Sequence, residues 1–363
     1  MITLYRPSGY DSPRASSFAG CSVDDKPLDV ENGSSFKEID TGRVFRYDKE
    51  NNLWIEQKST TGGAGATEPY IEETYDADGN LIGAKMYGYT KVRDYAFYGC
   101  TSLALTSLPE GLTSIGEGAF VGCSNLALTS LPEGLTSIGE GAFVGCSNLA
   151  LTSLPDGLTS IGINVFVNCT NLALTSLPEG LTSIGEGAFA SCTNLALTSL
   201  PAGITSIADE TFNNCTNLAL TSLPDGLTSI GINVFVNCTN LALTSLPEGL
   251  TSIDHNAFLN CSNLALTSLP DGLTSIGYQI FGNCTNLALT SLPEGLTSID
   301  DWAFKDCTSL TSITFKGTPT IIKSSAFDGC TNLTDIKVPW AEGAVSGAPW
   351  GATNATITYN YTE

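Results

Sequence analysis

The sequence lacks basic residues over most of its length. Between Arg93 and Lys305 it contains no lysine and no arginine, and the formal net charge of the 363-residue chain is −22 at pH 7. Proteins that bind nucleic acids or anionic membranes need clustered basic side chains opposite the phosphate groups. We therefore exclude nucleic acids and anionic membrane surfaces as partners.

Long apolar runs are also missing. No stretch approaches the roughly 20 apolar residues needed to span a bilayer, so membrane insertion is not expected. The first residues, MITLYRPSGYDSPRASS, do not combine a basic segment with an apolar run, which a Sec signal peptide requires. We expect the chain to be made and folded in a cytoplasm, whatever its final destination.

The residues of common catalytic sites are scarce. The single histidine, His255, leaves no parts for a Ser-His-Asp or Cys-His arrangement. Gly116-Glu117-Gly118 lacks the third glycine and the strand–helix setting of a nucleotide-binding loop. We predict a protein that is not an enzyme and holds no cofactor. The enzymatic alternative is a carbohydrate-active protein that uses the abundant acidic residues.

Repetition is what the sequence has in abundance. A cysteine recurs every 23 residues, eleven times, from Cys100 to Cys330. A unit this short cannot bury its own apolar side chains, so tandem copies must stack on one another. The register predicts a repeat solenoid, mainly β, with short parallel strands and 3₁₀ or helical turns.

The repeating unit is TSLALTSLPEGLTSIGEGAFVGC, and ten copies run from 101 to 330. TSL is predicted as a short strand that ends at proline, which has no N–H for a ladder, and LTSI as a second strand. Six columns stay apolar almost throughout and should point inward: those of Leu103, Leu108, Leu112, Ile115, Phe120 and Cys123. Ladders of inward side chains are expected, formed by Phe120, Cys123 and Asn125 in one unit and by Phe143, Cys146 and Asn148 in the next. The asparagines would satisfy backbone groups at a bend.

The cysteines have three interpretations: disulfides, metal ligands or free thiols. Equivalent residues on neighbouring parallel coils lie about 4.8 Å apart. Parallel side chains nevertheless disfavour the S–S dihedral of about 90°, and no CxxC pair or histidine cluster accompanies them. We favour buried free thiols.

An acidic residue follows the proline in most units. The column consists of Glu110, Glu133, Asp156, Glu179, Asp225, Glu248, Asp271 and Glu294. One interpretation is a solvated face that keeps the array soluble. The other is an edge that binds Ca²⁺ or a cationic partner.

The pattern L-x-x-x-x-L-P-x-x-L-x-x-I-x-x-x-A-F-x-x-C resembles the 23-residue leucine-rich repeats of the BspA-like family over residues 90–338. The resemblance implies a leucine-rich repeat solenoid. One column departs from the family, because the central units carry Thr106 where an apolar residue is usual and Leu105 one position earlier. Leu105 and its equivalents, as far as Leu289, therefore either point inward or form an exposed apolar stripe. We favour the inward arrangement.

Composition divides the chain into five parts. Residues 1–57 are predicted to form a small β-rich module for anchoring or oligomerisation, with strands in GSSFKEID, RVFRYD and LWIEQ. The other parts are a flexible linker at 58–69, a hairpin cap and half-repeat at 70–100, the solenoid at 101–338 and a C-terminal cap at 339–363. The two end modules resemble segments of virion-associated and prophage proteins of gut bacteria and their phages.

The units differ most in the columns of residues 116–119 and 121–122. A bound partner would be expected on this face near the C-terminal half, where aromatic side chains can serve as anchors. The candidate ligand-binding residues are His255, Tyr278, Gln279, Trp302 and Lys305. Taken alone, His255 is a surface substitution in a variable column.

The leading functional hypothesis is a non-enzymatic fibre or surface-decoration protein of a phage or prophage virion. The solenoid would bind a bacterial surface protein or glycan during host attachment. Residues 1–57 would bind other virion proteins or further copies of the chain, giving a homo-oligomer. The alternative is a bacterial cell-surface adhesin of BspA type, which requires export.

Overall fold

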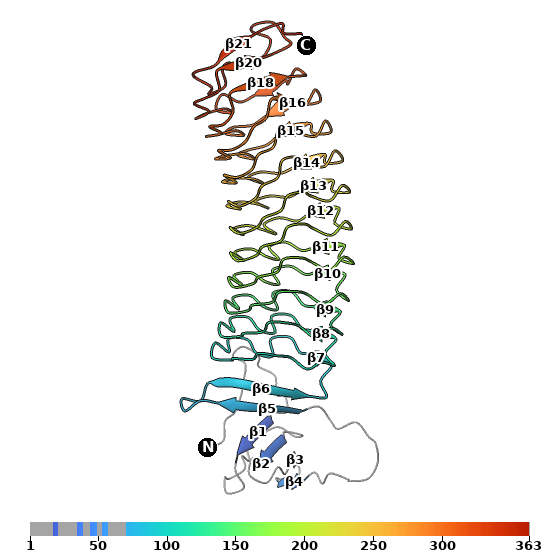
Figure 1. Cartoon of the computed structure of the whole chain (residues 1–363). Helices are drawn as coiled ribbons and strands as arrows, with labels where there is room; N and C mark the ends of the chain where they lie inside the picture. Colours follow the sequence, from blue (N-terminus) through green and yellow to red (C-terminus); the bar gives the residue numbers. More distant parts are fainter. Residues whose placement is uncertain (1–16, 21–34, 39–43, 49–52, 57–69, 363) are drawn as a thin grey trace. The chain divides into compact units, whose positions relative to one another are not determined.

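The computed structural model describes residues 17–20, 35–38, 44–48, 53–56 and 70–362, with side chains from residue 71 onward (Figure 1). The chain divides into two compact units, Met1–Glu68 with Tyr75–Gly79, and Pro69–Thr74 with Asn80–Glu363. The predicted linker at 58–69 lies outside the described residues.

The first unit contains a four-stranded sheet in the order β1-β2-β3-β4. β1 pairs with β2 in parallel, whereas β2, β3 and β4 form an antiparallel meander. The strands are β1 (Ser17–Gly20), β2 (Ser35–Glu38), β3 (Val44–Asp48) and β4 (Leu53–Glu56). β2, β3 and β4 lie in the three segments predicted as strands. β1, with the sequence SFAG, was not predicted because its small residues have little strand propensity.

The second unit begins with a two-stranded sheet, β5 (Tyr70–Tyr75) and β6 (Leu81–Tyr87). The turn between them is closed by a hydrogen bond from the Gly79 N–H to the Asp76 carbonyl. The Ile82 carbonyl accepts the Ala104 N–H at 3.0 Å, so β6 starts the stack of coils.

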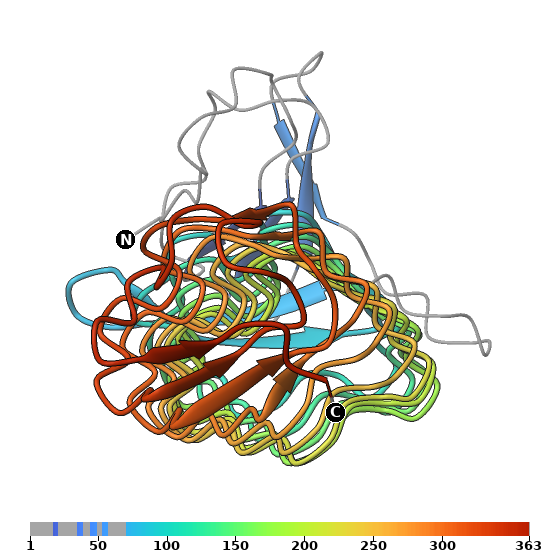
Figure 2. The ribbon, with the colours of Figure 1, turned by 90° about the horizontal axis from the view of Figure 1, so that it is seen from above.

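Each coil then contributes one short strand from its LTSI segment, as predicted. These strands pair in parallel and in register within four short sheets, as in the pairing of Ser114 with Ser137 and of Ile115 with Ile138, and the isoleucines are buried. Figures 1 and 2 show the coils stacked on one another. These strands are β7 (Lys91–Val92), β8 (Ser114–Ile115), β9 (Ser137–Ile138), β10 (Ser160–Ile161), β11 (Ser183–Ile184), β12 (Ser206–Ile207), β13 (Ser229–Ile230), β14 (Ser252–Ile253), β15 (Ser275–Ile276), β17 (Ser298–Ile299) and β19 (Ile321–Ile322). The predicted mainly-β solenoid is confirmed.

The other predicted strand, TSL before each proline, is wrong for most of the array. Only the C-terminal coils have a sheet there, made of β16 (Ser291–Leu292), β18 (Ser312–Phe315), β20 (Asp335–Lys337) and β21 (Thr356–Thr358). Earlier coils are linked there through bonds such as that from the Ala127 N–H to the Leu105 carbonyl. Leu105 and Leu108 both point inward but stand three residues apart, which breaks the two-residue alternation of a strand.

Besides the buried prolines of most units, the core contains the six predicted columns and two more. Leu105 is 7% exposed, and its equivalents from Leu128 to Leu289 are at most 2% exposed. The favoured inward arrangement is therefore correct, and there is no apolar stripe at this column. The second additional column is that of Ala119, which is fully buried.

Two ladders run the length of this core. The phenylalanines from Phe97 to Phe327 stack with ring centroids 5.0 to 5.7 Å apart and planes inclined by 1° to 15°. Beside them, each cysteine from Cys123 onward donates its Sγ–H to a phenylalanine carbonyl of the preceding coil at 3.0 to 3.1 Å. The cysteines from Cys123 to Cys330 are buried free thiols, as predicted. Burial raises the pKa of Cys123 and of Cys330 to about 12.

The inward asparagine ladder is wrong. Asn125 and Asn148 are exposed to solvent. The bend they follow is closed by a backbone bond from the Leu126 N–H to the Cys123 carbonyl at 3.0 Å. The core-facing carbonyls beside it are reached by the cysteine thiols, so no inward amide is needed.

Turns, without a helix, complete each coil of the described array. The Val121 N–H donates to the Gly118 carbonyl, as in a helical turn. Gly118 and Gly122, however, have φ of +54° and +73°. A right-handed helix cannot continue through left-handed residues. No helix in the described part of the chain has the length and hydropathy to cross a bilayer.

The C-terminal segment packs on the last coil. Trp350 is fully buried, its ring lies against Phe315 and Trp340, and its carbonyl accepts the Phe327 N–H at 2.9 Å. That N–H would otherwise meet a further coil. Trp350 thus terminates both the aromatic core and the hydrogen-bond ladder.

Candidate recognition surface on the turn face

The turn face consists of the columns of residues 117, 118, 121 and 122, which flank the buried columns of Ala119 and Phe120. Two of these columns hold residues with left-handed φ in nearly every coil. In the column of Gly122 they are Gly99, Gly122, Gly145, Asn168, Ser191, Asn214, Asn237, Asn260, Asn283, Asp306 and Gly329. In the column of Gly118 they are Tyr95, Gly118, Gly141, Asn164, Gly187, Glu210, Asn233, Asn256, Gln279 and Trp302.

This geometry explains much of the variability that the sequence shows on the turn face. Glycine and asparagine are the residues that adopt left-handed φ most readily, so exchanges between them preserve the backbone. Tyr95, Glu210, Gln279 and Trp302 depart from that rule, with φ between +51° and +59°. Side chains held in this region cost conformational energy, and such outliers concentrate at functional sites.

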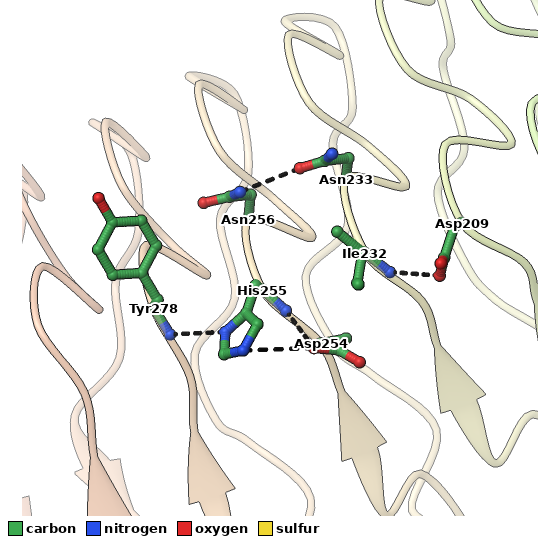
Figure 3. Close-up of polar contacts among 7 residues, drawn as sticks. All are labelled: Asp209, Ile232, Asn233, Asp254, His255, Asn256 and Tyr278. Atoms are coloured by element: carbon green, nitrogen blue, oxygen red, sulfur yellow. Dashed lines mark hydrogen bonds and ion pairs between the residues drawn. The ribbon is translucent and has the colours of Figure 1, made fainter.

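The middle of the turn face is held by side-chain amides. Asn237 donates to Asn214 at 2.6 Å, Asn260 to Asn237 at 2.7 Å and Asn283 to Asn260 at 2.8 Å. In the neighbouring column, Asn256 donates to Asn233 at 3.0 Å (Figure 3). These partly buried contacts join adjacent coils, so the asparagines have a structural role.

His255 also joins two coils. Its Nδ1 accepts the Tyr278 N–H at 3.2 Å, and its Nε2 lies 3.8 Å from Asp254 Oδ1 (Figure 3). The Asp209 carboxylate accepts the Ile232 N–H in the same way two repeats earlier. The accepting Nδ1 carries no proton, which leaves the proton of the neutral ring on Nε2. His255 therefore orients the backbone that carries Tyr278.

The structure brings three of the five candidate residues together. The rings of Tyr278 and Trp302 have centroids 5.5 Å apart and are inclined by 57°. Lys305 Nζ lies 5.4 Å from the centre of the Trp302 ring, within reach of a cation–π contact. All three side chains are half-buried. We call Tyr278, Trp302 and Lys305 the C-terminal aromatic cluster.

The other two candidates lie beside this cluster. His255 contacts the Tyr278 backbone, as described above. The Gln279 N–H donates to the Asp301 carbonyl at 3.3 Å, a backbone contact between coils. Sequence reasoning missed the Asp301 carboxylate, which accepts the Ser325 hydroxyl at 2.5 Å next to Trp302.

A second aromatic pair on the turn face was also missed. Tyr95 and Tyr98 occupy the columns of Gly118 and Val121 in the first coil, and their ring centroids are 6.1 Å apart with planes inclined by 58°. Tyr98 is 54% exposed. Writing the half-repeat KVRDYAFYGC in the same columns as the full units would have revealed both residues.

The acidic column lies elsewhere on the coil and is exposed. At its C-terminal end Asp271, Glu294, Gly295 and Lys316 line a cavity of about 450 Å³. Among the residues that the structure describes, no three His, Cys, Asp or Glu side chains gather closely enough to hold a metal ion. Binding of Ca²⁺ or of a cationic partner at this edge stays a prediction.

Comparison with known proteins adds the family. The profile of the BspA type leucine rich repeat region matches residues 90–219 and 251–341 in six copies. No curated protein matches. One similar solved structure is a leucine-rich repeat protein of T. pallidum, which is 33% identical in sequence. The match covers 47% of this chain and 87% of that chain, with a TM-score of 0.37.

Two further structures extend over more of the chain. A leucine rich cell surface protein from Faecalibacterium prausnitzii A2-165 has 24% identity, covers 88% of this chain and 97% of its own, and gives a TM-score of 0.44. The pneumococcal vaccine antigen PcpA has 19% identity, covers 92% and 100%, and gives a TM-score of 0.51, which is a likeness of fold. With the profile spanning most of the solenoid, this chain belongs to the BspA-type leucine-rich repeat family.

Proposed function

We propose that this protein is a non-enzymatic recognition protein of a bacterial surface, and that its C-terminal aromatic cluster contacts the partner. The observation that carries the proposal is Trp302. A half-buried indole occupies a left-handed backbone position where most coils have glycine or asparagine. Large aromatic side chains dominate the energetics of binding surfaces.

The fold supports binding better than catalysis. A stacked array presents long, regular outer faces, and its columns can vary without disturbing the core. The buried thiols have raised pKa values and donate hydrogen bonds to carbonyls inside the core, so they are unsuited to act as nucleophiles. Family membership favours the adhesin hypothesis over the virion hypothesis. Anchoring or oligomerisation through residues 1–57 stays a prediction.

Location is tested in the bacterium that encodes the chain. Antibodies against the solenoid should label intact, unpermeabilised cells, and protease treatment of those cells should remove the label. Labelling confined to purified phage particles would restore the virion hypothesis. Labelling only after permeabilisation would contradict both.

Binding is tested with an immobilised panel of extracellular matrix proteins and neutral polysaccharides. The variant Trp302→Asn removes the indole and places at this position the residue found at Asn233 and Asn256. The matched control is Glu210→Asn, in the same column and also left-handed, four repeats away from the cluster. Binding that is lost in Trp302→Asn and retained in Glu210→Asn supports the proposal, and equal binding by both variants contradicts it.

A further inference from the structure

The turn face has aromatic pairs near both ends of the array. Tyr95 and Trp302 occupy the same column, nine repeats of 23 residues apart. Both have left-handed φ, +55° and +59°. At about 4.8 Å per coil, the two positions are about 43 Å apart along the stack. Between them this column holds mainly glycine and asparagine, and Glu210 and Gln279 are the other exceptions.

The two pairs also resemble each other in geometry. Tyr95 and Tyr98 are inclined by 58°, and Tyr278 and Trp302 by 57°. Each pair has polar groups at its edge. In the first pair, the Tyr95 hydroxyl donates to the Glu117 carboxylate. In the second pair, Asp301 precedes Trp302 in the chain, and the Lys305 ammonium lies over the Trp302 ring. A pair of inclined rings bordered by polar groups suits a ligand with both apolar faces and hydroxyl edges.

Charge restricts the ligand further. The turn face between the pairs has no basic residue, because Arg93 and Lys305 bound a segment that contains only acidic charges. A polyanion would be repelled along this length. A neutral sugar polymer carries no such penalty, its pyranose rings can pack on aromatic rings, and its regular repeat offers the same epitope at both pairs.

We propose that Tyr95 and Tyr98 form a second binding site, and that one neutral polysaccharide chain occupies both aromatic pairs at once. The inference rests on the proposed recognition function and names the ligand class. Joining two weak sites in this way raises the overall affinity above that of either site by about 10²-fold or more. Binding should therefore depend on polymer length and on both pairs.

The test is affinity electrophoresis of the full chain in gels that contain galactomannan, xyloglucan, mannan or dextran, with heparin as the polyanion. The variants are Trp302→Asn and Tyr98→Val, the latter placing at this position the residue of Val121. Glu133→Gln, in the exposed acidic column, is the control. We expect retardation by at least one neutral polymer and none by heparin. Each binding-site variant should weaken polymer binding at least tenfold, to the level of an oligosaccharide too short to span both pairs.

The outcomes separate the two proposals. If Tyr98→Val binds the polymer as the unmodified chain does, the second site is refuted while the C-terminal aromatic cluster stands. If no neutral polysaccharide retards the chain but matrix proteins bind it through Trp302, the ligand class is refuted and the recognition function stands. Equal affinity for polymer and short oligosaccharide would also overturn the two-site arrangement.

Discussion

Cys146 Sγ donates a hydrogen bond to the Phe120 carbonyl of the preceding coil at 3.0 Å. The same carbonyl accepts the Cys123 N–H at 3.0 Å, so it is bonded both within its own coil and to the next one. This contact recurs along the array. The cysteine is therefore a connecting donor as well as an apolar filler, which explains a polarisable residue with an S–H in a column otherwise suited to alanine or valine.

The donor role predicts different effects for two substitutions of Cys215, whose thiol donates to Phe189. Cys215→Ala loses the bond and leaves a small cavity, which should lower the free energy of unfolding by about 1–3 kcal/mol. Cys215→Ser keeps a donor and should cost less. Urea unfolding followed by circular dichroism measures both. A serine variant less stable than the alanine variant would show that the thiol serves mainly as apolar volume.

The thiols also predict sensitivity to alkali. Burial raises the pKa of Cys123 and Cys330 to about 12, whereas an unfolded cysteine titrates near about 8.5. Below this lower value both states are protonated and the thiols add no pH dependence. Between the two values only the unfolded chain releases its protons, so stability should fall by about 1.4 kcal/mol per pH unit for each buried thiol.

Urea midpoints between pH 7 and pH 11 check this dependence. Tyrosine and lysine also titrate in that range, so the control compares the unmodified chain with Cys215→Ala. The slope above pH 9 should be shallower for the variant. Parallel slopes would mean that the Cys215 thiol titrates alike in the folded and unfolded states.

The left-handed backbone at Glu210 leads us to expect that an asparagine there stabilises the protein. Glu210 has φ +56° in a column where asparagine is common. Glu210→Asn should raise the free energy of unfolding by about 0.5–1 kcal/mol, because asparagine adopts this conformation at lower cost. Glu186→Asn, at a neighbouring position outside the left-handed region, is the control and should bring no gain. Thermal unfolding of the two variants measures the difference, and equal gains would refute the backbone explanation.

The contacts of Trp350 lead to a prediction for the unfolding of the C-terminal end of the array. Its ring is fully buried, and its carbonyl accepts the Phe327 N–H. Trp350→Ala should destabilise the last coils by about 3–5 kcal/mol, the cost typical of removing a buried aromatic ring. Hydrogen exchange at the Phe327 amide should accelerate, while amides near the middle of the array should change little. The exposed Glu342→Gln is the control, and unchanged exchange at Phe327 would contradict the terminating role.

The 23-residue register was sufficient to predict the solenoid, because Ile115, Phe120 and Cys123 recur in every unit and only stacking buries them. The strand before each proline was predicted wrongly. The three-residue spacing from Leu105 to Leu108 prevents a regular strand, and composition alone does not show this. Asn125 was placed inside because an amide can satisfy a bend, but the cysteine thiol and a backbone bond already do so.

The candidate recognition surface was predictable in part. Variation pointed to the turn face, and Tyr278 and Trp302 do contact each other. Exchange of glycine for asparagine in the columns of Gly118 and Gly122 is typical of left-handed positions. This part of the variation is therefore explained by backbone geometry and not by binding. Contacts such as that of Lys305 with the Trp302 ring depend on side-chain directions across coils, which a sequence register does not give.

Recognition through Trp302 is tested most directly by one measurement, the affinity for whichever immobilised polysaccharide or matrix protein binds most tightly. The unmodified chain is compared with the variants Trp302→Asn and Glu210→Asn. Urea unfolding of the same preparations shows that all three are folded. We expect at least a tenfold loss of affinity in Trp302→Asn, with stability equal to or above that of the unmodified chain, and no loss in Glu210→Asn. Full affinity in a folded Trp302→Asn variant would contradict recognition through Trp302, because the indole would then contribute nothing to binding.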